Sequence, residues 1–505
     1  MARLLRILHL THRWLGIALG LLVLLWFLSG LVMLFVAYPH LSEDQRLNFL
    51  PTIPSGKPQV TPLAAWQSLG RAGWPKAVRL DAEPGFAVYR FLAENRWWVV
   101  NAENGHRVEP LDARQAAAHT LALRGGAVHQ IVPIERDQWT VSRRYEAWRP
   151  LYRVELVDGR EVYVSRDSRE VVLETHRAER IWNWVGSVVH WVYFTPLREQ
   201  PELWRQLVLW LSALAFIPAL SGMWLGVDRL RLRLKKRYQG GRLTPYREWT
   251  KRWHHLMGLG AGLFIVTWLL SGWLSLSPFG WGSGVHTQEM RQQMAGKTFD
   301  AVSLDERPVL PTGTRSVEWL NVGGVSWLRL KGDFDGDGRV MGVRLLNRGG
   351  GLQTAFGKDE LLKAAAAVLP QFARSGEWLT GPDDEYYSLR HIPRRFPVLR
   401  LQFSDPDATR LYLDPSSGQI VHAVNRYSVT RRWLYHGLHR FDFPPLLVWP
   451  VLRDGVVILL SLAGGCVVLL GCWLGLKRMR RAGGQGRVKQ GKDMRPGIAS
   501  HVNCG

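Results

Sequence analysis

The stretch THRWLGIALGLLVLLWFLSG, residues 11–30, decides the fold of this 505-residue chain. After Arg13 it holds no charged side chain, and its length is close to the roughly 20 residues that a helix needs to cross a bilayer. Four uncharged stretches in all predict membrane-spanning helices, at 15–36, 207–227, 256–285 and 455–476. No small-residue cleavage site interrupts the first, so we expect it to remain as an anchor.

The opening stretch recurs as WHHLMGLGAGLFIVTWLLSG, residues 253–272. At this offset of 242 residues His12 matches His254, and the closing W-x-L-S-G motif is kept. A second match, at an offset of 249, pairs His190 with His439. Each repeat then contains a span, a long loop, a histidine-bearing helix and a second span. Because an even number of crossings separates the halves, we expect a pseudo-two-fold axis along the membrane normal.

Basic residues gather beside the predicted spans. The N-terminus, the 228–252 loop and the tail after Leu476 together carry 21 Lys and Arg against 3 Asp and Glu. Since Lys and Arg are retained on the cytoplasmic side, we expect a multi-pass protein of the bacterial inner membrane with both termini in the cytoplasm. The net charge of +23 then reflects topology and contact with membrane lipid. Nucleic-acid binding is the less favoured alternative, and we predict none.

The two long segments between spans are expected in the periplasm. Runs such as REVYVSRDSREVV and TRLYLDPSSGQIVHA alternate aromatic or β-branched residues and contain turn residues, which is typical of β-hairpins. Alanine-rich stretches at 112–123 and 359–369 predict short helices. We therefore expect a small sheet with one or two helices in each segment. The three cysteines, Cys466, Cys472 and Cys504, lie outside both segments, so no disulfide supports them.

Four of the sixteen histidines keep a partner in the other repeat and lie at or beside a predicted span: His12, His190, His254 and His439. An imidazole at the membrane edge is costly unless it has a partner, which makes these four functional candidates. His436 lies three residues before His439, but the other repeat has serine there, so His436 is the second-choice ligand. Most other histidines have no counterpart and are expected to form surface hydrogen bonds only.

Glycines accompany the first histidine of each repeat on the same helical face. These glycines are Gly16, Gly20, Gly258 and Gly262. Close packing of membrane helices explains the glycines but not the histidines. A glycine-lined face beside an axial imidazole also suits a flat macrocycle, because no Cβ stands in its way.

Two neutral imidazoles are a standard axial ligand set for haem iron, and they suit electron transfer because they leave no open position. His12 with His254 can hold one haem, and His190 with His439 can hold a second near the opposite membrane face. No C-x-x-C-H motif occurs, so any haem is haem b. Pairing with a neighbour such as His9 or His436 stays open. Structural histidines, a non-haem metal and a proton path also stay open.

Three motifs carry a resemblance to a known family. They are HRWLG with W-x-L-S-G around the first span, Tyr-x-Asp-Pro-x-x-Gly at 412–418, and R-W-L-Y-H-G-L-H at 432–439. Together they resemble the PepSY-associated transmembrane family, iron-regulated membrane proteins of bacteria, from about His12 to Leu476. The four paired histidines fall on the family's motif positions. The first copy departs from the pattern, because Ser165 and Arg166 replace Asp-Pro, so the first loop domain is the more degenerate.

The resemblance implies an α-helical membrane protein with four transmembrane helices in two tandem repeats and two exported α+β PepSY-like domains. Some members of the family are ferric-siderophore reductases that carry haem b. We therefore expect two haems and reduction of ferric siderophore or another Fe(III) chelate, with electrons from a cytoplasmic or quinol donor. The alternative is a non-enzymatic PepSY scaffold or accessory protein for metallophore uptake or envelope-peptidase control.

The expected boundaries follow from these assignments. They are 1–13 for the cytoplasmic N-terminus, 14–37 for the first transmembrane helix, 38–176 for the first PepSY-like domain, 177–227 for the histidine-bearing helix and second transmembrane helix, 228–252 for the basic cytoplasmic loop, 253–276 for the third transmembrane helix, 277–425 for the second PepSY-like domain, 426–476 for the second histidine-bearing helix and fourth transmembrane helix, and 477–505 for the basic tail.

Overall fold

The computed structural model describes residues 2–54, 56, 58–235, 238, 242, 244–280, 285, 287–334, 342–347 and 351–492. Among these residues, four helices are long and apolar enough to cross a membrane, which fits a membrane-embedded protein. They are α1 (Ala2–Phe35), α8 (Pro201–Lys235), α9 (Trp249–Ser275) and α16 (Pro450–Lys492). The third uncharged stretch continues past the end of α9, but Ser277 has a left-handed backbone (φ 50°) and Pro278 follows it, so the helix stops.

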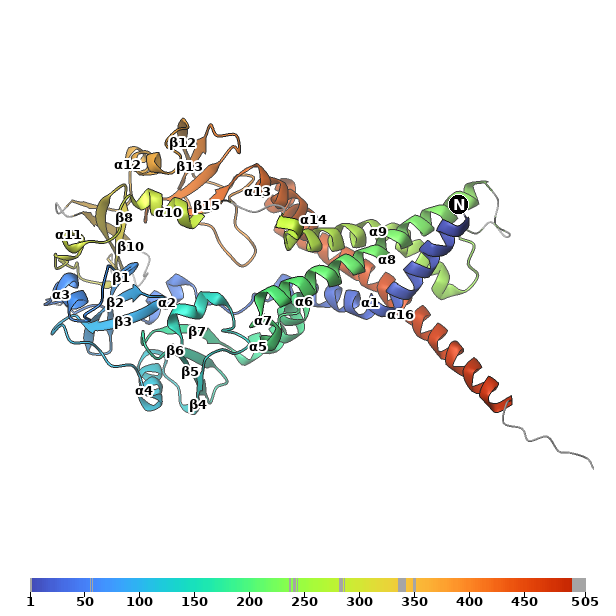
Figure 1. Cartoon of the computed structure of the whole chain (residues 1–505), viewed down its shortest axis with the longest axis horizontal. Coiled ribbons are helices and arrows are strands. Elements are labelled where there is room, and N and C mark those ends of the chain that lie inside the picture. The colour runs from blue at the N-terminus through green and yellow to red at the C-terminus, as the bar shows by residue number, and fades with distance from the viewer. Residues whose placement is uncertain are drawn as a thin grey trace, which may run out of the picture.

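The four long helices form one bundle (Figure 1). α1 packs against α8 and α16, and α9 packs against the same two helices, so α1 and α9 lie diagonally across the bundle. Phe27, Ala215, Ile265 and Val467, one from each helix, meet in its interior. Outward side chains such as Leu21 are apolar and exposed, as expected where lipid completes the burial.

The two long segments, between α1 and α8 and between α9 and α16, fold mainly as β-sheet at one end of the bundle (Figure 1). The N-terminus lies at the other end. The first loop segment, residues 36–200, contains α2 (Glu43–Phe49), α3 (Pro62–Gln67), β1 (Ala77–Glu83), β2 (Phe86–Ala93), β3 (Arg96–Asn101), α4 (Ala113–Arg124), β4 (Val128–Ile134), η1 (Arg143–Trp148), β5 (Leu151–Leu156), β6 (Glu161–Ser165), β7 (Val171–Thr175), α5 (Arg177–Asn183), η2 (Trp184–Val188), α6 (Val189–Trp191) and α7 (Thr195–Arg198).

The second loop segment, residues 276–449, has a similar order of elements. It contains η4 (Pro278–Gly280), α10 (Thr287–Ala295), α11 (Ala301–Leu304), β8 (Thr314–Val322), β9 (Val325–Gly332), β10 (Gly342–Asn347), β11 (Leu352–Gln353), α12 (Lys358–Ala364), η5 (Ala365–Ala367), β12 (Arg374–Leu379), β13 (Val398–Phe403), β14 (Arg410–Asp414), β15 (Gln419–Val424), α13 (Arg426–Arg431), η6 (Arg432–Gly437), α14 (Leu438–Arg440) and α15 (Pro444–Val448).

The strands form three antiparallel sheets. Strands β4–β7 and strands β12–β15 each make a four-stranded sheet within one loop segment. The third sheet has seven strands in the order β11-β10-β9-β8-β1-β2-β3, so both loop segments contribute to it. At its centre β1 pairs with β8, with Leu80 opposite Val317. Each segment thus contains a small sheet, as the sequence predicted, and the shared sheet is an addition that the sequence did not predict. The shared sheet forms because pairing two edge strands satisfies backbone groups that each half would leave open.

The predicted hairpins and short helices are present at the expected positions. β6 pairs with β7, and β14 pairs with β15. The β14–β15 turn places Gly418 at φ 65°, and Arg169 has nearly the same backbone angle, φ 64°, in the β6–β7 turn, although a side chain is unfavourable there. α4 begins with a capping box in which the Asp112 carboxylate accepts a hydrogen bond from the Gln115 backbone.

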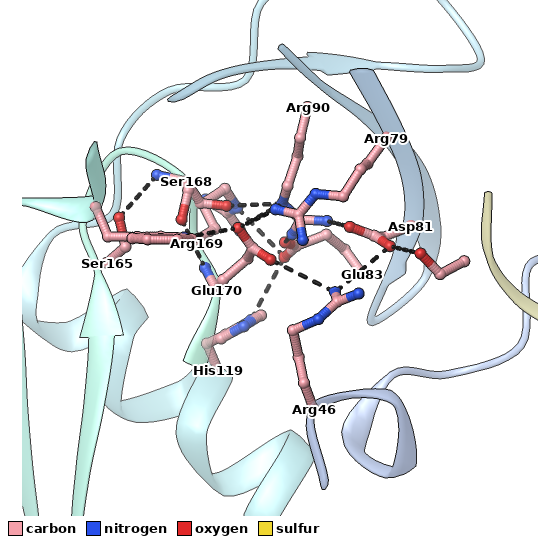
Figure 2. A network of polar contacts seen from close by, with 12 residues as sticks. Arg46, Arg79, Asp81, Glu83, Arg90, His119, Ser165, Ser168, Arg169 and Glu170 are labelled. Atoms are coloured by element: carbon pink, nitrogen blue, oxygen red, sulfur yellow. Dashed lines mark hydrogen bonds and ion pairs between the residues drawn. The ribbon is translucent and has the colours of Figure 1, made fainter. Parts of the chain in front are cut away.

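A buried charge network joins the shared sheet to the β6–β7 turn (Figure 2). Arg90 of β2 is only 1% exposed. Its guanidinium donates to Asp81 Oδ2 at 2.9 Å, to Glu83 Oε1 at 2.5 Å and to the Ser168 carbonyl at 2.9 Å. His119 of α4 also contacts Glu83, at 3.4 Å. Because every member is buried, the network fixes how the first four-stranded sheet sits on the shared sheet.

Two histidine pairs as the candidate functional site

The first pair, His12 and His254, lies between the diagonal helices α1 and α9, near the N-terminal end of each helix. We name it the far pair because the N-terminus lies at the end of the bundle opposite the sheets (Figure 1). The ring centroids are 6.1 Å apart and the planes are inclined by 37°. His12 Nδ1 lies 2.8 Å from the Pro218 carbonyl of α8, and His254 Nδ1 lies 3.0 Å from the Val467 carbonyl of α16. A carbonyl only accepts hydrogen bonds, so each Nδ1 carries the proton and each Nε2 keeps a free lone pair.

The second pair, His190 of α6 and His439 of α14, lies toward the sheets and is named the sheet-side pair (Figure 1). Its ring centroids are 6.3 Å apart, with planes inclined by 72°. Burial lowers the pKa of His190 to about 4 and the pKa of His439 to about 3. Both imidazoles are therefore neutral near pH 7, which is the form that binds a metal ion.

The W-x-L-S-G motif at the end of the first span forms a cradle for His190. The Nδ1–H group of His190 donates to the Trp26 carbonyl at 3.1 Å and to Ser29 Oγ at 3.1 Å. A Cβ on Gly30 would lie 3.4 Å from His190 Cε1, so the glycine lets the ring rest against the α1 backbone. Sequence reasoning used this motif as a landmark of the repeat and of the family resemblance, and missed that Trp26, Ser29 and Gly30 contact the histidine.

The second copy of the motif holds His439 in the same way. His439 Nδ1 lies 3.2 Å from the Trp268 carbonyl and 3.0 Å from Ser271 Oγ. A Cβ on Gly272 would lie 3.5 Å from His439 Cε1. Both sheet-side rings are thus oriented by the same three kinds of contact.

An unusual helical turn positions each sheet-side histidine. The π-helices η2 (Trp184–Val188) and η6 (Arg432–Gly437) come immediately before α6 and α14. After the histidines, Val192 and Phe441 have left-handed backbones, with φ of 52° and 57°. π-helical turns and left-handed residues other than glycine are costly and concentrate at functional sites.

Two further glycines allow α8 and α16 to approach the far pair. A Cβ on Gly222 would lie 2.4 Å from His12 Cε1 and 2.7 Å from its Nδ1. A Cβ on Gly471 would lie 3.2 Å from His254 Cε1. Sequence reasoning searched the helices that carry the histidines, so it did not identify these glycines on the neighbouring helices.

The four glycines that the sequence analysis placed beside the far pair fall into two classes. An added Cβ would meet nothing within 4 Å at Gly16 and only Val467, at 3.8 Å, at Gly258. At Gly20 it would lie 2.9 Å from Cys472 Sγ, and at Gly262 it would lie 2.5 Å from Met223 Cε. The first two leave space one helical turn from the histidines, whereas the other two permit close helix packing.

The separation of the rings in each pair fits two imidazoles that share one metal ion. A metal–nitrogen bond of about 2.0 Å and about 1.1 Å from Nε2 to the ring centre put two such rings about 6.2 Å apart. The observed separations are 6.1 and 6.3 Å. Among the residues that the structure describes, no group of three or more His, Cys, Asp or Glu side chains could hold a metal ion. A metal at either pair would therefore need further ligands of its own, as iron in a porphyrin has.

The two pairs lie at different depths in the bundle. His12 and Trp26, whose carbonyl binds His190, are roughly 21 Å apart along α1 at about 1.5 Å per residue.

In comparisons with known proteins, no family model matches the chain and no curated protein matches it significantly.

Two neighbouring histidines have other partners. His436, the second-choice ligand, contacts Asp442, with Nδ1 3.7 Å from Oδ2. Both nitrogens of His255 are used, by Thr244 Oγ1 at 3.0 Å and by the Gly226 carbonyl at 3.1 Å. The structure therefore brings together His12 with His254 and His190 with His439, and it places His436 and His255 in other contacts.

Glu385, within electrostatic reach of Arg432, gives a prediction about pH. Burial raises the pKa of this carboxyl to about 7 from an ordinary 4.5. Between about pH 4.5 and pH 7 the folded protein therefore holds a proton on Glu385 that the unfolded chain releases. The contribution of this carboxyl to the free energy of unfolding is full below about pH 4.5 and is lost as the pH rises through 7. We expect the Tm of the purified full chain to fall between pH 5 and pH 8, and Glu385→Gln to reduce that fall. The exposed Glu94→Gln should leave the pH dependence unchanged; an unchanged slope in Glu385→Gln would contradict the assignment.

Proposed function

We propose that the chain is a membrane protein with two b-type haems that carries electrons between the ends of its helix bundle and reduces Fe(III) chelates, ferric siderophores among them. The observation that carries the proposal is the geometry of the far pair and the sheet-side pair. Each consists of two imidazoles about as far apart as two that share one iron would be, with both Nδ1 atoms hydrogen-bonded and neither Nε2 atom hydrogen-bonded to a residue that the structure describes.

The residues of the chain perform three tasks in this proposal. The backbone carbonyls fix the tautomer and orientation of each ring and make Nε2 a better donor to a metal. The two imidazoles of each pair would hold the iron of a bound haem and would leave it no free position for oxygen. The surrounding helices keep water from the interior. Haem, when bound, supplies one-electron transfer between Fe(III) and Fe(II).

Matching contacts in the two halves support an architecture of two tandem repeats. Pro218 and Val467, whose carbonyls bind the far pair, differ by the same 249 residues as His190 and His439. Trp26 and Trp268 differ by the same 242 residues as His12 and His254. In this proposal the loop segments are PepSY-like domains, the membrane is the bacterial inner membrane, and both termini are cytoplasmic.

The reduction would need one electron per iron from a cytoplasmic or quinol donor. Haem held by the far pair and by the sheet-side pair would supply the one-electron chemistry between the two ends of the bundle. Fe(III) in the chelate becomes Fe(II), which hard oxygen ligands hold less tightly, so iron is released. The far end of the bundle faces the cytoplasm in this orientation, where the basic 228–252 loop provides a surface for a donor.

Reduced-minus-oxidised spectra and the haem content of the purified full chain test the proposal. We expect haem b at two per chain, with about half of it lost in His12→Ala and about half in His190→Ala. His129→Ala, a change at an exposed position of β4, should keep both haems. A chain without a Soret band, or with identical spectra in all four proteins, would contradict the proposal and favour the non-enzymatic scaffold. If the chain binds haem but does not reduce ferric chelates, the electron-transfer part of the proposal stands and the Fe(III) substrate is contradicted.

A further inference from the structure

A cluster of arginines lies beside His439. It consists of Arg432, Arg440 and Arg453 arranged around Asp442, and we name it the cationic cluster. Arg453 Nη1 lies 3.1 Å from Asp442 Oδ1, and Arg440 Nε lies 3.5 Å from Oδ2. Arg432 Nη2 donates to the Asp442 backbone carbonyl at 2.9 Å. The Asp442 carboxylate therefore contacts two guanidinium groups, and the Asp442 backbone carbonyl binds the third.

Two arginines of the cationic cluster, Arg432 and Arg453, are buried, whereas the Arg440 side chain is 30% exposed, and the hydrogen bonds of Arg432 are incomplete. Arg432 is 6% exposed and Arg453 is 7% exposed. Within the described part of the chain, Nε and Nη1 of Arg432 have no hydrogen-bond acceptor, and Nδ1 of His436 lies 3.7 Å from Asp442 Oδ2 without a hydrogen-bond partner. The Arg432 guanidinium instead faces the rings of Trp433, at 4.1 Å, and Tyr387, at 5.0 Å. Buried donors without acceptors are costly, so they indicate a missing anionic partner.

The charges around the cluster indicate how much anionic charge is missing. The connected ionic groups are Arg390, Arg432, Arg440 and Arg453 against Asp442 and Asp454. This leaves two positive charges without a carboxylate. Glu385, near Arg432, does not fill the gap, because burial raises its pKa to about 7 and leaves it partly protonated at neutral pH.

The matching positions of the first half are aromatic or neutral. An offset of 249 residues replaces Arg440, Asp442 and Arg453 with Trp191, Tyr193 and Trp204. These rings contact each other, with centroids 5.8 Å apart for Trp191 and Tyr193 and 5.9 Å apart for Tyr193 and Trp204. Tyr38 adds to this aromatic cluster, 5.7 Å from Trp191. The second half of the chain thus has a cationic cluster where the first half has an aromatic cluster at the matching positions.

A b-type haem has the same asymmetry, because its two propionate carboxylates lie on one edge and its methyl and vinyl groups lie on the other. We propose that the cationic cluster binds the propionates of the haem held by the sheet-side pair, and that the aromatic cluster covers the apolar edge. Guanidinium groups suit this role because each can donate two parallel hydrogen bonds to a carboxylate. This inference rests on the proposed function. It adds that the haem binds in one of the two orientations that the histidine pair alone would allow.

The test compares haem b with its dimethyl ester, which has the same iron and ring but no carboxylates. The full chain carrying His12→Ala, so that only the sheet-side pair remains, is produced without haem and titrated with each compound in detergent. We expect haem b to bind about tenfold more tightly than the ester, or better. Adding Arg432→Gln and Arg453→Gln should bring the ratio of the affinities for haem b and the ester close to one. The affinity for the ester should stay within about twofold of the parent value. The control variant Arg136→Gln changes an exposed arginine and should keep the parent ratio of the two affinities.

Retained binding of the ester separates a lost carboxylate contact from a misfolded chain. Equal affinity for the two compounds in the parent would overturn the propionate site and leave the haem proposal standing. An equal loss of affinity for both compounds in the arginine variants would also overturn it, because the cluster would then be structural. A parent that binds neither compound would overturn the proposed function together with this inference.

Discussion

Gly222→Ala should lose about half of the bound haem. The new Cβ would lie 2.4 Å from His12 Cε1 and 2.7 Å from its Nδ1, which is closer than atoms in contact can be. His12 would have to leave its hydrogen bond to Pro218, or α8 would have to move away from α1. Either change removes the alignment of His12 with His254, whereas the sheet-side pair is not touched.

The measurement is haem per chain together with the reduced-minus-oxidised spectrum. Gly260→Ala is the matched control, since it adds the same methyl group to α9 at a position with nothing within 4 Å. Gly471→Ala should have a smaller effect, because its Cβ would lie 3.2 Å from His254 Cε1 and a shift of a few tenths of an ångström would accommodate it. Full haem content in Gly222→Ala would show that the far pair does not depend on this close approach.

Arg90→Met should destabilise the shared sheet by roughly 3–5 kcal/mol. Arg90, Asp81 and Glu83 are all nearly fully buried, and methionine would leave both carboxylates without their nearest cationic partner. The cost comes from the uncompensated buried charges and not from the loss of one contact. The Ser168 carbonyl would also lose its donor, which loosens the β6–β7 turn.

Hydrogen exchange of the β1 and β2 amides measures this effect in the full chain, because local opening can be followed without unfolding the helix bundle. Arg136→Met is the control; its pair with Glu146 is about 40% exposed on both sides, so we expect a change of about 0–1 kcal/mol. Similar protection of β1 in the two variants would mean that the buried network does not hold the shared sheet in place.

Local patterns in the chain were sufficient for much of the fold. An uncharged stretch long enough to cross a bilayer predicts a helix without any knowledge of its neighbours, and the four long apolar helices confirm that prediction. The β6–β7 and β14–β15 hairpins follow in the same way from alternating side chains and turn residues. The matched histidines could be selected because duplication repeats them at fixed offsets in the sequence.

The sequence by itself therefore determined the spans, the hairpins and the four candidate histidines. Only the tertiary structure decided that β1 would pair with β8 and that the rings of each histidine pair would lie just over 6 Å apart. It also decided which carbonyls, hydroxyls and glycines of neighbouring helices would hold those rings. These contacts join residues that are distant in the chain, and they depend on how helices and strands pack, whereas a span or a hairpin depends only on residues close in sequence.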